Sequence, residues 1–511
     1  MSAGILRRSD SREGTLFGRH RSRKDPIAGT SIHGWTERAG TGGLLPEPIN
    51  AAPPDACPDP ISYPSGATVP WTKHHGPQPP PDRLRPTPVT SFRTDSRVAI
   101  TGVGAVTPIG VGQREFLAGW RGGVLAITEA PWAARAPLPL LTARVPDVFD
   151  PRETLSEREI ASTDRCAQYA LVAAGEALSQ AGLDEPESLD PLRTAVVDGT
   201  AAGGLYSIML GQHRFDTGGI AAIPPKTMLA GQANTAAARI ALRHGLHGPL
   251  RTVTTACASA LDALATGLEL LALDRADVVV CGGSDSAAVS ESEEFVPVFS
   301  IAGRVFGMET PEVDPKRAVL PFDVARSGIV FGEGAAWLVL ESAAHVEARG
   351  GEPLCWVLGV GSCADSHHPS ASDPTGQWQA RAMELALADA SLAAHRVDFV
   401  MAHATGTPKG DLSEARALGL VFGGSGAQPP VSSLKGHTGH TGGSSGTMSL
   451  IAAIDALRTG ILEPVLGTNV VDPEMNIDVV SEQSRPVGRE VAMVNAFGFG
   501  GQNTVALIGA P

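Results

Sequence analysis

Three segments place reactive side chains where regular structure is expected to end. Cys257 lies in the segment TTACASA (254–260), after an extended stretch and directly before a helical pattern of leucines. His403 follows an apolar stretch that breaks into a Gly/Thr turn, VMAHATGTP. His440 lies in the glycine-rich turn VSSLKGHTGHTGG together with Lys435, one of few lysines after residue 100. A thiol, two imidazoles and an ammonium at such turns are typical of nucleophilic catalysis.

The expected position of Cys257 at the start of a helix has two chemical consequences. The positive end of the helix dipole favours the thiolate and therefore predicts a lowered thiol pKa. Backbone N–H groups at the turn could also stabilise an oxyanion on a group that the sulfur attacks. The alternative is a small buried cysteine among alanines, which is also common in proteins.

The other cysteines show no metal-binding or disulfide pattern. No Cys-x-x-Cys pair or histidine-rich zinc spacing occurs. Cys166, Cys281 and Cys355 lie in apolar runs and are expected to be buried reduced thiols, which suits a reducing cytosol. His437 lies three residues before His440, a spacing open to chelation, but no carboxylate or cysteine accompanies the pair. We therefore expect no metal ion.

Composition excludes several classes of function. The net charge of −14 argues against general nucleic-acid binding. No run approaches the roughly 18–20 apolar residues of a membrane span. Residues 1–96 are rich in Pro, Gly, Arg and Ser and are predicted to be a disordered extension. Their arginines could form an organelle transit segment, but acidic residues interrupt them, so we expect a cytoplasmic protein.

From residue 97 the hydrophobic pattern alternates between strands and helices, which predicts an α/β fold in two similar halves. The predicted strands are 97–101, 194–197, 278–281, 336–340, 355–358, 399–402, 430–433, 492–495 and 503–508. The predicted helices are 164–181, 235–244, 258–273, 377–390 and 446–458.

From Arg97 to Pro511 the chain resembles the β-ketoacyl-acyl-carrier-protein synthases of the elongating type, which use one Cys and two His. Besides the three segments above, the resemblance includes RVAITGVGAVTP (97–108), PFDVARSGIVFGEG (321–334) and NAFGFGGQN (495–503). It implies the thiolase-like fold, with α-β-α-β-α layers and two pseudo-symmetric halves. We place these halves at 97–348, with the nucleophilic Cys, and 349–511, with both catalytic His.

The resemblance assigns roles to the reactive residues. Cys257 is expected to carry the acyl chain as a thioester, and His403 and His440 to hold the malonyl thioester while it loses carbon dioxide. Lys435 is expected to act through its charge. Phe499 is expected to gate the acyl pocket and to share the oxyanion hole with Cys257 through its backbone N–H.

Other residues are expected to support the site. Asp411 and Glu414 match acidic positions of the family and are the natural partners of Lys435, while Phe497 and Gly498 belong to the gate segment. Two positions depart from the family pattern. Ser449 replaces a common Glu, so the details of malonyl activation could differ. Ala202 aligns with a common Ile of the acyl pocket, so a longer or wider pocket is expected.

The resemblance implies a 3-oxoacyl-[acyl-carrier-protein] synthase that performs a decarboxylative Claisen condensation in fatty-acid or polyketide chain elongation. It implies no cofactor, an acyl carrier protein as partner, and a homodimer or a heterodimer with a chain-length-factor-like subunit. One alternative is a non-catalytic chain-length-factor-like subunit, but such subunits lack the nucleophile that Cys257 would supply. A thiolase is a second alternative, which the Lys435 turn and the Phe499 segment fit poorly.

Overall fold

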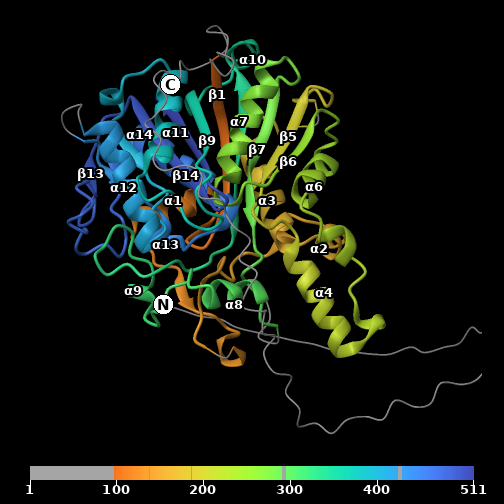
Figure 1. Cartoon of the computed structure of the whole chain (residues 1–511). Coiled ribbons are helices and arrows are strands. Elements are labelled where there is room, and N and C mark those ends of the chain that lie inside the picture. The colour runs from red at the N-terminus through yellow and green to blue at the C-terminus, as the bar shows by residue number, and fades with distance from the viewer. Residues whose placement is uncertain (1–96, 137, 186, 291–294, 424–427) are drawn as a thin grey trace, which may run out of the picture. The chain divides into compact units, whose positions relative to one another are not determined.

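The computed structural model describes residues 97–511 except 137, 186, 291–294 and 424–427 (Figure 1). The predicted disordered extension over 1–96 therefore lies outside the described residues. In the described part of the chain, no helix has the length and apolar character needed to cross a membrane. Cys166, Cys281 and Cys355 are buried free thiols, as predicted.

Five main strands form the sheet of the first half. They are β1 (Val98–Thr107), β5 (Thr194–Gly199), β6 (Leu250–Val253), β7 (Val278–Asp285) and β8 (Gly334–Ser342). Their order across the sheet is β6-β5-β7-β8-β1. Strands β6, β5 and β7 run parallel, whereas β8 is antiparallel to both β7 and β1.

The second half repeats this arrangement. Its strands are β9 (Cys355–Ala364), β10 (Phe399–Met401), β11 (Val431–Ser432), β14 (Val491–Gly498) and β15 (Gln502–Gly509). Their order is β11-β10-β14-β15-β9, and the parallel and antiparallel pairs fall at the same places as in the first half. In both halves the third, second, fourth, fifth and first strands follow one another, so the expected pair of similar halves is confirmed. The division at 348/349 stays a prediction.

The two halves are joined edge to edge. Val98–Ile100 of β1 pair with Cys355–Val357 of β9, which makes one sheet of eleven strands. The eleventh strand, β2 (Gly110–Val111), pairs with β1. Two small antiparallel sheets of two strands each are separate from this sheet. One consists of β3 (Ile127–Glu129) and β4 (Leu141–Ala143), the other of β12 (Ile461–Leu462) and β13 (Arg485–Pro486).

The helices cover both faces of each half. They are α1 (Gln113–Arg121), α2 (Glu157–Ser162), α3 (Arg165–Gln180), α4 (Leu205–Gly218), α5 (Thr227–Ala230), α6 (Thr235–His244), α7 (Ser259–Ala272), α8 (Val298–Val305), α9 (Pro315–Ala318), α10 (Ala343–Arg349), α11 (Gln377–Asp389), α12 (Pro408–Phe422), α13 (Lys435–Thr438) and α14 (Ser445–Thr459).

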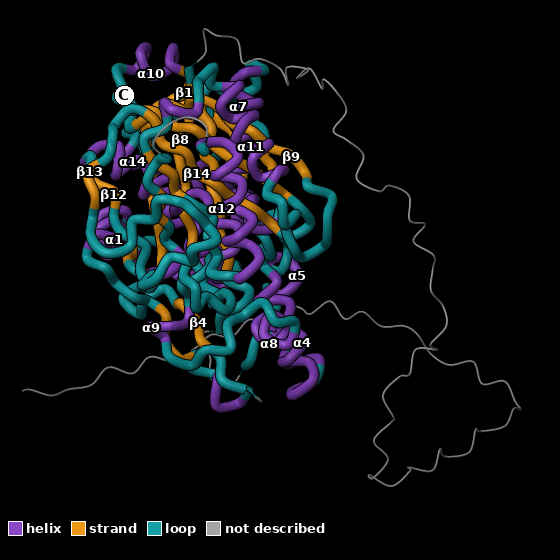
Figure 2. Tube along the Cα trace, turned by 60° about the vertical axis from the view of Figure 1, so that its left-hand side comes forward, coloured by secondary structure: helices purple, strands orange, loops and turns teal. Residues whose placement is uncertain are grey.

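Contacts between these elements give five layers. Helix α3 packs on β1, β7 and β8, and α6 packs on α3 and β5. On the other face, α7 packs on β5 and β7 and also contacts α14, which packs on β14. On the outer face of the strands of the second half, α11 packs on β9 and β15, and α12 packs on α11. Figure 2 shows the strands in orange between purple helices. The predicted thiolase-like α-β-α-β-α order is confirmed.

Side chains of each strand alternate between two apolar clusters. In β5, Ala195 and Val197 join the cluster around the middle helices, whereas Val196 joins the cluster around α3. In β14, Val494 faces the middle layer and Met493 faces the helices α11 and α12. This alternation is the period-two pattern of a strand buried on both faces. The alternation determines which side chains of each strand face the middle helices.

One buried carboxyl interrupts this apolar pattern. Asp198 of β5 is fully buried, and its Oδ2 has no hydrogen-bond partner among the described residues. Burial, followed by the nearby charge of Asp285, raises the pKa of Asp198 well above its usual range. The folded state therefore holds this proton more tightly than the unfolded state, and the contribution of Asp198 to stability falls as the pH rises above the unfolded pKa.

We expect Asp198→Asn to stabilise the protein. Because the amide cannot ionise, the free energy of unfolding should rise by about 1–3 kcal/mol near pH 8, and the gain should shrink toward about pH 4, where an unfolded Asp is itself half protonated. Denaturant titration of both proteins at the two pH values measures this. An equal effect at both pH values would show that ionisation of Asp198 has no part in it.

Candidate active site

Cys257 lies in a tight turn at the start of a middle-layer helix. The turn is the 3₁₀ segment Ala256–Ala258, and α7 begins at the next residue. Ala256 has a φ of 52°, in the left-handed region that few residues other than glycine adopt. The Ser259 hydroxyl fixes the turn, because it accepts the N–H of Thr255 at 2.9 Å and donates to the carbonyl of Ala256 at 2.6 Å. The turn presents the thiol at the amino end of α7.

The end of β14 passes directly behind this turn. A Cβ at Gly498 would lie 3.1 Å from the backbone nitrogen of Cys257 and closer still to a neighbouring carbonyl, so only glycine fits. Phe499 follows and is 42% exposed. The next two residues, Gly500 and Gly501, both have a φ of 80°. The expected gate segment is therefore a glycine turn beside the nucleophile.

Both predicted histidines lie next to Cys257. His403 follows β10, and His440 follows α13. His440 Nε2 lies 3.0 Å from the Cys257 Sγ, and the two imidazole centroids are 5.4 Å apart with nearly perpendicular rings. The Phe497 ring also packs against His403, with a centroid distance of 5.9 Å. The fold thus brings together one thiol and two imidazoles from separate halves.

Hydrogen bonds assign the ring hydrogen of His440. The backbone N–H of Gly442 donates to His440 Nδ1 at 3.3 Å, and the Ser445 hydroxyl lies 3.1 Å from the same atom. Because Nδ1 accepts a hydrogen bond, the hydrogen of the neutral ring is on Nε2. His440 therefore directs an N–H donor at the Cys257 sulfur.

The two predicted carboxylates hold the backbone around His403. Glu414 accepts hydrogen bonds from the N–H groups of His403 at 2.9 Å and Ala404 at 2.7 Å. Asp411 accepts from the N–H groups of Gly406 at 3.0 Å and Phe322 at 2.8 Å. Burial raises the pKa of Asp411 to about 7 and also raises that of Glu414. These carboxylates fix the turn after β10 by direct contact.

Lys435 is buried at the start of α13. Burial lowers the pKa of its ammonium to about 8, while the charges of Glu414, Cys257 and Asp411 oppose that shift. Burial, and then the Lys435 charge, lowers the pKa values of both catalytic-site histidines well below the usual range. Both imidazoles are therefore neutral near pH 7.

The thiol differs from the prediction made from its helix position. Burial raises the pKa of Cys257 to about 11, an effect that Lys435 opposes and Asp285 reinforces. The backbone N–H groups of Phe499 and of Cys257 itself also lower this pKa, because they can donate to the sulfur. The resting side chain is thus a thiol, and both N–H groups lie close to its sulfur.

These groups open into a cavity of about 430 Å³. Cys257, His403, His440 and Phe499 all line it. Ala202, the predicted acyl-pocket residue, is not among the lining residues. A volume of this size is typical of sites for small ligands.

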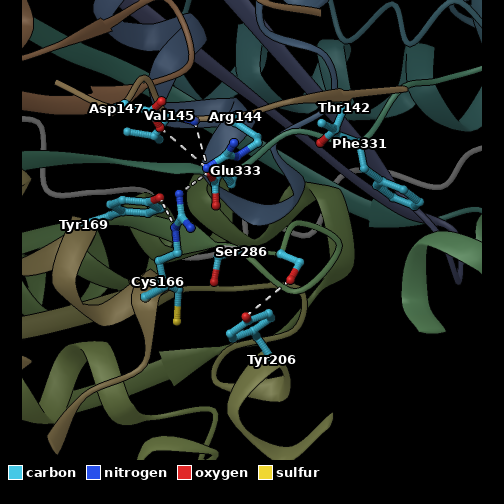
Figure 3. A network of polar contacts seen from close by, with 12 residues as sticks. Thr142, Arg144, Val145, Asp147, Cys166, Tyr169, Tyr206, Ser286, Phe331 and Glu333 are labelled. Carbon is cyan, nitrogen blue, oxygen red and sulfur yellow. Dashed lines mark hydrogen bonds and ion pairs between the residues drawn. The ribbon is translucent and has the colours of Figure 1, made fainter. Parts of the chain in front are cut away.

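A second polar network anchors the chain behind His440. Glu333 is fully buried and accepts hydrogen bonds from Arg165 of α3 at 2.8 Å and from the N–H of Val145 at 3.0 Å (Figure 3). The preceding residue, Gly332, donates its N–H to the carbonyl of His440 at 2.9 Å. The ion pair therefore ties the backbone at His440 to a helix of the first half.

Sequence reasoning missed one residue of the site, Asp285. It ends β7, is 5% exposed, and accepts a hydrogen bond from the backbone of Gly443, close to His440. An aspartate that directly ends a long apolar strand is the signal that could have identified it. Ser449, where the family commonly has Glu, is buried within α14.

Comparisons with known proteins identify the family to which the chain is similar. The model of the β-ketoacyl synthase N-terminal domain matches residues 95–345, and that of the C-terminal domain matches residues 354–469. The 3-oxoacyl-[acyl-carrier-protein] synthase 2 of Coxiella burnetii is 32% identical over 413 residues, which cover 80% of this chain and 97% of that protein.

Two solved structures are also similar. The ishigamide ketosynthase/chain length factor has a TM-score of 0.74 and 30% identity, and the match covers 82% of this chain and all of that one. A type II polyketide synthase acyl-carrier protein in complex with its ketosynthase, bound to the hexaketide, has a TM-score of 0.73 and 25% identity with the same coverage. The resemblance inferred from the motifs is confirmed, and the chain belongs to the β-ketoacyl synthase family of acyltransferase-type condensing enzymes.

Proposed function

We propose that this condensing enzyme joins an acyl group held on Cys257 to the two-carbon unit of malonyl-[acyl-carrier protein]. The observation that carries the proposal is the 3.0 Å contact between His440 Nε2 and the Cys257 sulfur, with the His403 ring beside it, in one cavity. The reaction gives a 3-oxoacyl carrier-protein thioester and carbon dioxide.

In the first half-reaction the Cys257 sulfur attacks the carbonyl carbon of an acyl carrier-protein thioester. A carbon–sulfur bond forms to Cys257, the bond to the carrier sulfur breaks, and the carrier thiol leaves with the proton. The Nε2–H of His440 can donate a hydrogen bond to the thiolate, and the charge of Lys435 keeps the raised pKa of Cys257 from exceeding about 11. The N–H groups of Cys257 and Phe499 suit the tetrahedral oxyanion.

In the second half-reaction the malonyl thioester loses carbon dioxide. The electron pair of the broken carbon–carbon bond forms an enolate, whose oxygen gains negative charge. Neutral His403 and His440 can each donate a hydrogen bond to that oxygen without first losing a proton. The enolate carbon then attacks the Cys257 thioester, the carbon–sulfur bond breaks, and the thiolate is regenerated.

The remaining predicted residues support these steps. Asp411 and Glu414 hold the His403 turn, and Lys435 sets the electrostatic balance between the thiol and the imidazoles. Gly498 permits the close approach of the gate segment, and Phe497 packs on His403. Glycine turns of this kind allow an aromatic gate to move.

We infer that the acyl and malonyl groups arrive on acyl carrier protein. Lys409 is exposed and lines the cavity, so it offers a positive charge to an acidic partner at the opening. Intact-protein mass spectrometry with a panel of acyl- and malonyl-carrier proteins tests the function. The expected result is an acyl adduct on the enzyme and a 3-oxoacyl product on the carrier protein. The number of two-carbon extensions then distinguishes a role in fatty-acid synthesis from one in polyketide synthesis. An enzyme that neither takes up acyl groups nor releases carbon dioxide would contradict the proposal.

We further propose that the working enzyme is a dimer, either of two copies or with a chain-length-factor-like subunit. Strand β6 ends the order of the sheet, so its outer edge is unpaired among the described residues. Exposed apolar side chains occur in the part of the chain between β5 and β6, including Ile220, Met228, Leu229 and Leu242. Unpaired strand edges with apolar surroundings favour pairing with another chain.

We expect light scattering to give the mass of a dimer, with activity in the same fraction. Deletion of the first 90 or so residues should leave the dimer and its activity unchanged, because the composition of that segment predicts a disordered extension. A stable, fully active monomer would contradict both forms of the proposal.

The acyl pocket is expected to favour long or bulky chains, because Ala202 is three carbons smaller than Ile. Each buried methylene contributes about 0.8 kcal/mol to binding. We therefore expect Ala202→Ile to shift the preferred substrate to shorter chains, with rates that differ several-fold across carrier-protein thioesters of roughly six to sixteen carbons. Identical chain-length profiles for both proteins would show that a neighbouring side chain fills this space.

A further inference from the structure

Asp285 makes an unusual set of contacts for a residue outside the catalytic trio. Its Oδ1 accepts hydrogen bonds from the Thr200 hydroxyl at 2.8 Å and from the N–H of Ala202 at 2.9 Å. Its Oδ2 accepts from the N–H groups of Ala201 at 2.9 Å and Gly443 at 2.5 Å. The four donors come from two segments, one in each half of the chain.

Each of these segments is assigned a part in the proposed reaction. Residues 200–202 follow β5 and include Ala202, which is predicted to border the acyl chain. Gly443 belongs to the turn after His440, and its neighbour Gly442 donates the hydrogen bond to His440 Nδ1. One carboxylate therefore contacts both the acyl segment and the turn that orients the ring.

The packing around Asp285 leaves no room for a side chain in the turn after His440. A Cβ at Gly442, where φ is +64°, would lie 2.7 Å from the Asp285 Oδ2, and a Cβ at Gly443 would lie 2.9 Å from the same atom. Both distances are too short for a side chain. The glycine turn thus fits closely against the carboxylate.

Charge gives Asp285 a second effect on the site. It lies close enough to Cys257 to raise the pKa of the thiol, whereas Lys435 lowers it. Among the described residues, Asp198 and Cys166 also interact electrostatically with Asp285. Burial raises the pKa of Asp285, but its four donors favour the ionised form.

We propose that Asp285 is a positioning residue whose carboxylate holds the acyl segment 200–202 and the His440 turn in one fixed arrangement across the two halves. This inference rests on the proposed function, because it assigns a purpose to segments that the reaction uses. It goes beyond that function in linking the choice of acyl chain to the geometry of the imidazole.

Asp285→Asn tests the proposal with two readouts that should move in opposite directions. An amide presents N–H groups to at least one of the backbone donors, so the His440 turn should shift and condensation should fall by about 10- to 100-fold. Loss of the negative charge should lower the Cys257 pKa, so alkylation by iodoacetamide near pH 8 should become several-fold faster. A general loosening of the fold would also expose the buried thiol and accelerate its alkylation. The comparison is therefore made only if circular dichroism and denaturant titration show that the variant is folded and about as stable as the wild type.

Two further variants keep the test decisive. Asp398→Asn is the matched control, because Asp398 also accepts two backbone N–H groups but precedes β10, at the end away from His403. It should change neither readout. Thr200→Val removes one donor and keeps the charge, so it should alter the acyl chain-length profile without accelerating alkylation. If Asp285→Asn fails to fold, Thr200→Val alone tests whether Asp285 holds the segment 200–202 in place.

The proposal is overturned if Asp285→Asn slows alkylation and condensation together, or if Thr200→Val leaves the chain-length profile unchanged. Alkylation does not depend on malonyl chemistry. If Cys257 is alkylated at the expected rates but the enzyme never forms a 3-oxoacyl product, the proposed function is refuted. The comparison of thiol reactivity between the variants then remains valid.

Discussion

Cys257→Ala is expected to abolish condensation while the protein stays folded. A covalent nucleophile has no substitute in the site, so the rate should fall by at least about 10³-fold. The thiol lines a cavity and is only partly exposed, so its replacement by the smaller methyl group should cost little stability. Product analysis by mass spectrometry, intact mass for the acyl adduct and circular dichroism for the fold measure the three parts of this prediction.

Cys363→Ser is the matched control for that experiment. Cys363 is also partly buried, and its pKa is likewise raised to about 11, mainly by burial. Its sulfur donates to the Trp378 carbonyl at 3.1 Å, and in the described part of the chain the His403 and His440 rings group with Cys257 instead. The control should keep both the adduct and the activity. Continued synthesis of 3-oxoacyl product by Cys257→Ala, or transfer of the adduct to Cys363, would refute the assignment.

Replacement of either catalytic histidine by alanine should reduce malonyl decarboxylation more than self-acylation. Removing one donor to a developing enolate oxygen should cost about 100-fold or more. Because His440 Nε2 also contacts the Cys257 sulfur, His440→Ala should slow acylation moderately, whereas His403→Ala should affect it least. Release of carbon dioxide from malonyl carrier protein and the rate of adduct formation give the two numbers separately.

His437→Ala is the control for these variants. This buried ring lies on the same turn, but its Nδ1 pairs with the carbonyl of Val124 at 3.0 Å and takes no part in the group around Cys257. Its loss should lower stability and leave the ratio of decarboxylation to acylation unchanged. Equal losses of both steps in His403→Ala would contradict separate roles for the nucleophile and the imidazoles.

Much of the fold follows from hydrophobic patterning, because both faces of the sheet are buried. All nine predicted strands and all five predicted helices are present, and most strands extend further than their apolar runs. β1 continues from 101 to Thr107 through glycine and alanine, which carry little strand signal. β6 is not predicted, because its four residues are exposed or half-buried and form no apolar run.

The missed helix α12 shows where local signals compete. The stretch after His403 suggests a Gly/Thr turn, yet Thr407 caps a helix by accepting the N–H of Gly410, and Pro408 occupies its first position. Thr followed by Pro is a helix-start signal, and giving it more weight would have identified this helix. With that helix in place, Asp411 and Glu414 face the backbone at His403.

The reactive residues of the site could be predicted from their types and turns, but their electrostatics could not. The helix start predicts a more acidic Cys257, whereas desolvation outweighs it and raises the pKa to about 11. Asp285 acts on backbone donors that are 83 to 158 residues away in sequence, and no local pattern encodes such contacts. Burial and long-range proximity depend on the whole fold.

The repeated strand order also has an evolutionary consequence. Cys257 and His440 both lie between the third and fourth strands of their halves, each in the turn before a middle-layer helix. Two copies of one ancestral half could therefore have diverged at the same position, with one copy acquiring the nucleophile and the other a hydrogen-bond donor. Neither copy contains the complete chemistry. Recombination between homologous genes should then preserve function only when it keeps compatible halves together.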